Sequence, residues 1–236
     1  MTTTFHIDFK EQEIKLQNDL AFFKEYIEFN LDKLKGREHK LNSLLNEDIS
    51  ETPHFKEILE NIYEQDKIRL PAYFYHSTIV SLYSLLEVTL NEICNTIIKK
   101  TDFAFSLEQI AYKNIIDKAR IFLTKVANLN FENTDTLWLK ITTIQKLRNY
   151  IVHDNTQIKS KDITTNLIKL LNDFGIIQSE IDKEFFFITN PQLLFDFLNI
   201  IKDFFQEIFV QLNKMKFRKF ERPEPIEIYN MVFTDE

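Results

Sequence analysis

The spacing of apolar positions along the chain is typical of amphipathic helices. Apolar side chains recur three or four positions apart in long stretches at residues 7–35, 71–100, 106–129 and 191–212, and this spacing places them on one face of a helix. Another amphipathic stretch, TLWLKITTIQKLRNYIVH, follows Asp135, which can cap a helix. The pattern therefore predicts a chain built mainly from helices.

Capping and breaking residues predict where these helices begin and end. Gly36 is placed to end the first one, and the polar stretch that follows is expected to be irregular in part. Thr52 and Pro53 supply an N-cap and a first-turn proline for a short helix. Ser106, with Gln109 three positions later, forms a capping-box pattern that opens the helix ending near residue 129.

The segment before the last helix has a different pattern. A helix is expected at residues 162–172, and Gly175, several β-branched residues and the run FFFIT then indicate a small β-hairpin. Only two glycines and five prolines occur in 236 residues, too few for the turns of a sheet-dominated fold. We expect an all-α, up-and-down helical bundle at residues 70–215, an N-terminal helical extension at 1–69 and an extended tail at 216–236.

Composition narrows the class of protein. The single cysteine, Cys94, cannot form an intramolecular disulfide, and neither a leader peptide nor a membrane span is indicated, so a cytoplasmic location is expected. The net charge of -7 argues against broad electrostatic binding of nucleic acid but allows a small local phosphate site. No cofactor or metal is expected, since the sequence has no glycine-rich phosphate loop, no HExxH helix and no zinc-ligand array.

One segment contains candidate catalytic residues. Arg148, Asn149 and His153 lie in LRNYIVHDN, which resembles the Rx4-6H signature of the HEPN superfamily, with a polar residue directly after the arginine. The resemblance implies a helical bundle whose motif lies near a helix end. It also implies a metal-independent endoribonuclease of toxin-antitoxin, abortive-infection or antiviral systems. Such proteins act on RNA as homodimers whose two motifs face one cleft, and some have an antitoxin or another defence-system partner.

A second pair, Arg69 and His76, also satisfies the spacing. Leu70 and Pro71 follow this arginine, so the polar neighbour is missing and the proline is expected to prevent a continuous helix. We therefore favour the motif at Arg148.

The residue types at this motif suit RNA cleavage without a metal. The imidazole of His153 can transfer a proton near neutral pH, and the planar guanidinium of Arg148 can bind two phosphate oxygens. Asn149 shares a helix face with His153 and can orient it or hold a phosphate oxygen. Arg148 lies about 140° from His153 around an ideal helix, so a helix end or a second subunit is expected to bring them together.

Other interpretations of the motif stay open. Arg148 could form a structural ion pair, for example with Glu87, and His153 could be a histidine stabilised at a helix C-terminus. The fold would then serve as a catalytically silent dimer for binding or sensing. Tyr150 and Asp154 flank the motif and could support it or be structural. Three lysines could supply positive charge for RNA or belong to a solvated face: Lys146, Lys159 and Lys161.

Overall fold

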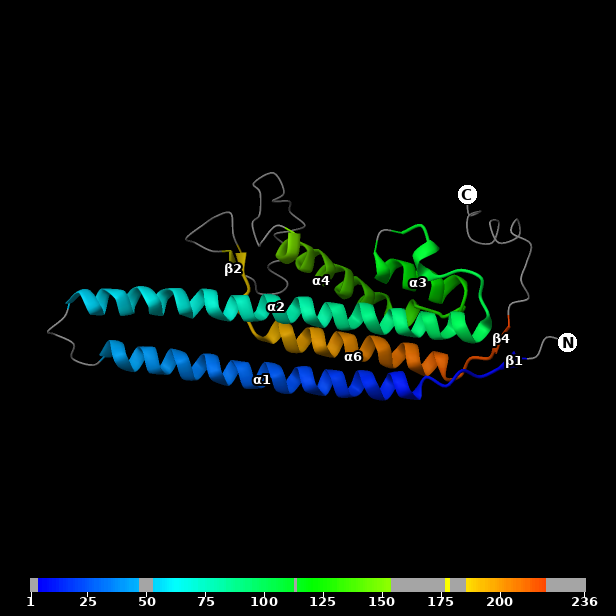
Figure 1. Ribbon diagram of the computed structural model, residues 1–236, viewed down its shortest axis with the longest axis horizontal. Helices are drawn as coiled ribbons and strands as arrows, with labels where there is room; N and C mark the ends of the chain where they lie inside the picture. Colours follow the sequence, from blue (N-terminus) through cyan, green and yellow to red (C-terminus); the bar gives the residue numbers. More distant parts are fainter. Residues whose placement is uncertain (1–3, 47–52, 113, 154–176, 179–185, 220–236) are drawn as a thin grey trace. The chain divides into compact units, whose positions relative to one another are not determined.

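The chain is an all-α helical bundle in the computed structural model (Figure 1), as the apolar spacing predicted. The structure describes residues 4–46, 53–112, 114–153, 177–178 and 186–219. The longer helices within these ranges are α1 (Lys10–Asn46), α2 (Pro53–Thr101), α3 (Ile115–Lys125), α4 (Asp135–His153) and α6 (Gln192–Leu212). Single turns of 3-10 helix, η1 (Leu107–Gln109) and η2 (Glu132–Thr134), precede α3 and α4.

Two short antiparallel pairs of strands accompany the helices. Strand β2 (Ile177–Gln178) pairs with β3 (Phe186–Phe187), which confirms the small hairpin predicted before the last helix. Strand β1 (Thr4–Phe5) pairs with β4 (Phe217–Arg218), a pairing that the sequence pattern did not predict. The helix predicted at 162–172 and residues 220–236 of the predicted tail lie outside the described residues.

The chain divides into two compact units, and helices α1, α2 and α6 contribute to both. The motif unit consists of Asn18–Ser84 and Thr136–Lys202, and it carries Arg148, Asn149 and His153. The terminal unit consists of Met1–Gln17, Leu85–Asp135 and Asp203–Glu236. The division of the sequence predicted between residues 69 and 70 stays a prediction.

In the motif unit, α1 and α2 lie antiparallel. Arg37 pairs with Asp66, with 2.5 Å between Nε and Oδ2, and the ring of Tyr26 lies 5.7 Å from that of Phe74. Tyr26 precedes Arg37 in α1, whereas its partner Phe74 follows Asp66 in α2, so the two helices run in opposite directions. The buried apolar residues of this unit include Ile27, Leu59, Tyr75, Ile79, Leu82, Tyr83, Ile141, Ile144, Leu147, Ile188, Leu194 and Phe197.

In the terminal unit, the segments that precede α1 and follow α6 pack on each other. Phe9 packs on Phe217, with ring centroids 6.4 Å apart. The backbone of Asn130 donates to Gln211 Oε1 at 2.9 Å and accepts from Gln211 Nε2 at 2.8 Å, which fastens the loop before α4 to the end of α6. The buried apolar residues here include Ile7, Phe9, Leu16, Leu86, Leu90, Ile93, Phe122, Leu123, Phe204, Phe205, Phe209 and Leu212.

Helix α1 does not end at Gly36 as predicted, but continues to Asn46. Glycine inside a helix costs about 1 kcal/mol relative to alanine, and three later leucines offset that cost. Leu41, Leu44 and Leu45 are half-buried in the extra turns, so their packing outweighs the weak local preference of a glycine for the helix end.

Pro71 likewise does not interrupt its helix, and the break predicted between Arg69 and His76 is wrong. Helix α2 begins at Pro53 as predicted but runs without interruption to Thr101, with Pro71 inside it. An internal proline removes one backbone hydrogen bond and costs about 3 kcal/mol. Ala72 and Tyr75, which follow directly, are buried, and burying a large apolar side chain contributes about 1.5–3 kcal/mol.

The helix predicted from Ser106 to residue 129 is wrong in its first part. Gln109 Oε1 accepts from the backbone N–H of Ser106 at 2.8 Å, as a capping box requires, but this cap opens only the single turn η1. Helix α3 begins later, where Asn114 Oδ1 accepts from the backbone N–H of Asp117 at 2.8 Å. The second cap therefore sets the start of the helix.

Candidate functional site

Helix α4 presents the motif in its last two turns. Its buried side chains are Trp138, Ile141, Ile144 and Leu147, which follow one another in steps of three. Such steps fall about 60° short of a full turn, so the buried stripe winds around the helix. By the last two turns the stripe has moved away from Asn149 and His153, and both of these side chains are exposed.

The guanidinium of Arg148 is held at the edge of this exposed side. Its Cζ lies over the ring of Tyr83 from α2, 5.7 Å from the centroid. Its Nη1 donates to Asn149 Oδ1 at 3.3 Å. Its Nε is buried and has no hydrogen-bond acceptor among the described residues. The arginine is thus fixed by a ring face and a neutral amide, and its other N–H groups have no acceptor among the described residues.

The surroundings of Arg148 differ from those of a structural arginine in the terminal unit. Arg120 also lies over an aromatic ring, with its Cζ 5.6 Å from the centroid of Phe131, but its Nη2 donates to the carboxylate of Asp135 at 2.9 Å. Within the described parts of the chain, Arg148 has no carboxylate partner. No carboxylate of these parts neutralises its positive charge, which can attract an anion.

Asn149 contacts the arginine of the motif, and His153 lies at the end of the helix. The carbonyl oxygen of Asn149 accepts from Arg148, so the amide positions the arginine rather than the imidazole. His153 is the last residue of α4, and its exposed imidazole makes no hydrogen bond to any described residue. The structure brings Arg148 and Asn149 together and leaves His153 one turn further on.

The flanking residues of the motif are only partly described. Lys146 is exposed and Tyr150 is half-buried on α4. Asp154, Lys159 and Lys161 lie outside the described residues.

The second arginine–histidine pair has no exposed imidazole. His76 is 6% exposed, and its Nε2 accepts from the backbone N–H of Ile188 at 3.4 Å. Burial lowers the pKa of His76 to about 4, so this imidazole is neutral near pH 7. A buried neutral histidine that already accepts a hydrogen bond suits a structural role better than proton transfer.

Sequence reasoning did not identify Tyr83 as part of the site. In the sequence it is one of the apolar positions of a regular helical stripe on α2. Its contact with Arg148 depends on which helix packs against that stripe. Nothing in the sequence around either residue indicates that α2 and α4 pack together here.

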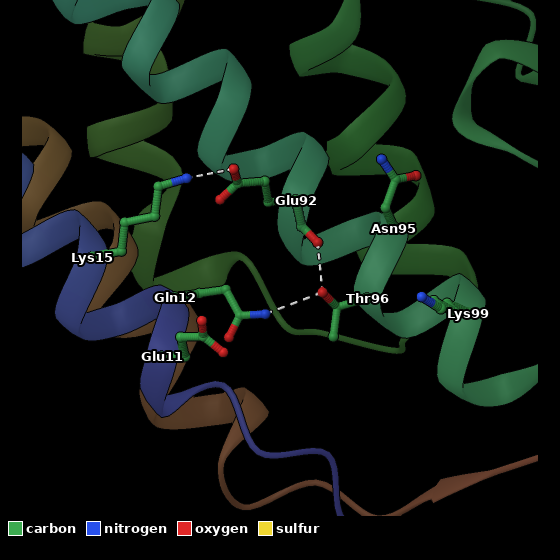
Figure 2. A pocket seen from close by; sticks show the side chains of 7 residues that line it. All are labelled: Glu11, Gln12, Lys15, Glu92, Asn95, Thr96 and Lys99. Atoms are coloured by element: carbon green, nitrogen blue, oxygen red, sulfur yellow. Dashed lines mark hydrogen bonds and ion pairs between the residues drawn. The ribbon is translucent and has the colours of Figure 1, made fainter.

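A cavity of about 410 Å³ lies in the terminal unit (Figure 2) and is lined by Glu11, Gln12, Lys15, Glu92, Asn95, Thr96 and Lys99. Two pairs of its side chains interact, while Gln12 Oε1 is buried and has no hydrogen-bond donor among the described residues. Gln12 Nε2 donates to Thr96 Oγ1 at 3.1 Å, and Lys15 pairs with Glu92, with 2.5 Å between Nζ and Oε1. None of the residues singled out in the sequence lines this cavity.

Within the described residues, no group of three or more potential ligand side chains could hold a metal ion. No helix in the same part of the chain is long and apolar enough to cross a membrane.

Comparisons with protein-family models, with curated proteins and with solved structures gave no match. The candidate site therefore rests on the geometry of the motif unit: a stacked arginine, an adjacent amide and an exposed histidine at the end of one helix.

Proposed function

We propose that the chain is a metal-independent endoribonuclease of the HEPN type that acts in a toxin or antiviral defence context. The observation that supports the proposal best is the set of contacts made by the guanidinium of Arg148. It is fixed by Tyr83 and Asn149 and has no carboxylate partner among the described residues. A guanidinium held in this way suits a phosphodiester, whose oxygens its planar fork can bind in pairs.

The proposed reaction is attack of the ribose 2'-hydroxyl on the adjacent phosphorus. One group must remove the 2'-hydroxyl proton, another must protonate the leaving 5'-oxygen, and the charge on the phosphorane must be stabilised. His153 serves in proton transfer because its imidazole is exposed at the end of α4. Arg148 stabilises the phosphorane, and Asn149 positions Arg148.

A second copy of the chain supplies the rest of the site in this proposal. Arg148 and His153 lie on different sides of α4, so one motif offers a proton-transfer group and a phosphate-binding group that do not meet. In a homodimer joined through the motif face, two motifs share one cleft and provide both the acid and the base. An antitoxin or another defence-system protein is the partner expected to control it.

The alternative is a catalytically silent helical dimer that binds or senses a ligand. The net charge of -7 favours it, since long-range repulsion of RNA opposes a nuclease. In this case Arg148 binds an anionic group without any chemistry, and His153 is dispensable.

The deciding experiment is RNA cleavage in excess EDTA. Purified wild type is incubated with labelled single-stranded RNA and transfer RNA, beside His153→Ala and Arg148→Ala. We expect wild-type cleavage that leaves cyclic-phosphate ends, and a loss of at least about a hundredfold in each variant, because proton transfer and charge stabilisation are each worth that much.

The matched controls are His39→Ala and Arg69→Ala, two exposed residues of the same types elsewhere in the motif unit. Both should cleave like wild type. Full activity in His153→Ala and Arg148→Ala would refute the assignment, and failure of wild type to cleave would favour the silent dimer.

A further inference from the structure

Tyr83 combines a fixed position with a contact to the motif. It lies in the middle of α2 and is 2% exposed, directly after Leu82 and one turn after Ile79, both of which are fully buried. The core of the motif unit therefore determines where its ring lies. Arg148 reaches this ring from a different helix, with its Cζ 5.7 Å from the centroid.

An aromatic ring holds a guanidinium in a way that a carboxylate does not. The ring attracts the cation through its face, so it fixes the plane of the group without occupying its N–H donors and without cancelling its charge. The remaining contact, from Nη1 to Asn149 Oδ1 at 3.3 Å, is with a neutral amide. Arg120 shows the opposite arrangement, since the carboxylate of Asp135 neutralises it.

We propose that Tyr83 is a positioning residue for the candidate reaction: its ring holds the guanidinium plane of Arg148 so that the free N–H donors face the scissile phosphodiester. This inference rests on the proposed function for its catalytic consequence. A guanidinium that is already oriented needs no reorganisation as charge develops on phosphorus, so its stabilisation of the transition state is larger. The hydroxyl of Tyr83 takes no part in this role.

The test compares Tyr83→Leu with Tyr83→Phe. Leucine keeps an apolar side chain but removes the ring face, and phenylalanine keeps the ring and removes only the hydroxyl. The matched control is Tyr75→Leu, because Tyr75 is also a buried tyrosine of α2, 5% exposed, and packs on Phe74. Melting temperatures show which variants stay folded.

Two readouts are measured on each folded protein. With RNA as the substrate, we expect Tyr83→Leu to lower kcat at least about tenfold with a smaller change in KM, and Tyr83→Phe and Tyr75→Leu to match wild type. The second readout is the NMR signal of the Arg148 Nε–H, assigned by its loss in Arg148→Lys. In wild type and Tyr83→Phe this signal should be shifted by the ring and exchange slowly with solvent, because Nε is buried.

The two readouts separate failure of the inference from failure of the proposed function. If wild type cleaves no RNA but the Nε–H signal is ring-shifted and depends on the ring at position 83, the ribonuclease assignment fails and the positioning of Arg148 stands. An unshifted, rapidly exchanging Nε–H in wild type would overturn the inference without any variant. Wild-type kcat in folded Tyr83→Leu, or an equal loss in Tyr75→Leu, would overturn it as well.

Discussion

The histidines at positions 76 and 153 show how burial decides what the same side chain can do. Both lie on helices and both follow an arginine at the spacing of the motif. His76 is enclosed by the core of the motif unit and accepts a backbone hydrogen bond, whereas His153 is exposed at the end of α4. Spacing alone does not separate the two pairs, because burial is set by the packing of distant segments.

The low pKa of His76 predicts a specific dependence of stability on pH. Its pKa is about 4 in the folded chain and about 6.5 in an unfolded one. Well above pH 6.5 the imidazole is neutral in both the folded and the unfolded chain, so it does not lower the free energy of unfolding. As the pH falls from 6.5 towards 4, only the unfolded chain binds the proton, so the free energy of unfolding decreases, and below 4 the loss levels off.

This loss should amount to about 2 kcal/mol between pH 7.5 and 5. It can be measured by urea unfolding of wild type and His76→Gln at both pH values, since glutamine can still accept a hydrogen bond but does not titrate. The pH-dependent loss should be about 2 kcal/mol smaller in the variant. His39→Gln, at an exposed position of α1, is the control, and equal losses in wild type and His76→Gln would contradict the prediction.

At the level of residues, the candidate site could be predicted only in part. Arg148, Asn149 and His153 were found because they lie within six positions of one another and their types suit one reaction. Tyr83 could not be found, because it lies 65 positions before Arg148 and looks like any apolar residue of its helix. The contact between Asn149 and Arg148 could not be predicted either, since ideal helix geometry places Asn149 on the same face as His153, whereas its Oδ1 accepts from Arg148.

At the level of elements, a helix boundary was predicted correctly where its local signal is not outweighed by the packing of neighbouring turns. Helices α2 and α4 begin at Pro53 and Asp135, because the fixed φ and missing N–H of proline suit a first turn and a carboxylate is favourable near a helix N-terminus. Gly36 and Pro71 were predicted to end or break helices, but there the local cost of each residue is smaller than the gain from burying the following turns. The β1–β4 pair could not be predicted, because two-residue strands at opposite ends of the chain have no period.

The direction in which Gly36→Ala changes the free energy of unfolding shows whether Gly36 lies inside a helix or at its end. Within a continuous α1, Gly36→Ala should raise the free energy of unfolding by about 0.5–1 kcal/mol, since alanine has the higher helix propensity and nothing lies within 4 Å of the added methyl group. If the helix ended at Gly36 in a left-handed cap, alanine would be destabilising.

Urea unfolding of Gly36→Ala beside Lys40→Ala provides the measurement. Lys40 is exposed one turn further along α1, and its replacement by alanine should change stability by only a few tenths of a kcal/mol. A decrease in stability on Gly36→Ala would show that the chain leaves the helix at this residue.

At the level of the whole molecule, we propose from the position of the motif that the activity requires two copies of the chain. The exposed side of α4 carries Lys146, Asn149 and His153, and Val152 beside them is 45% exposed. An apolar side chain among polar ones at the end of a helix is suited to the middle of an interface. If two such faces form the cleft, as we propose, an isolated subunit has a phosphate-binding arginine but only one histidine for two proton transfers.

Activity per subunit should therefore fall as the protein is diluted through the concentration at which dimers dissociate. Sedimentation analysis gives the fraction of dimer, and RNA cleavage in EDTA at the same concentrations gives the activity, so the two curves should coincide. Val152→Glu places a charge in the proposed interface and should shift both curves to higher concentration, whereas Val88→Glu, at an exposed valine of the terminal unit, should shift neither. Constant activity per subunit in a population of monomers would show that one motif completes the reaction alone, and the second proton would then have to come from another group of the same chain.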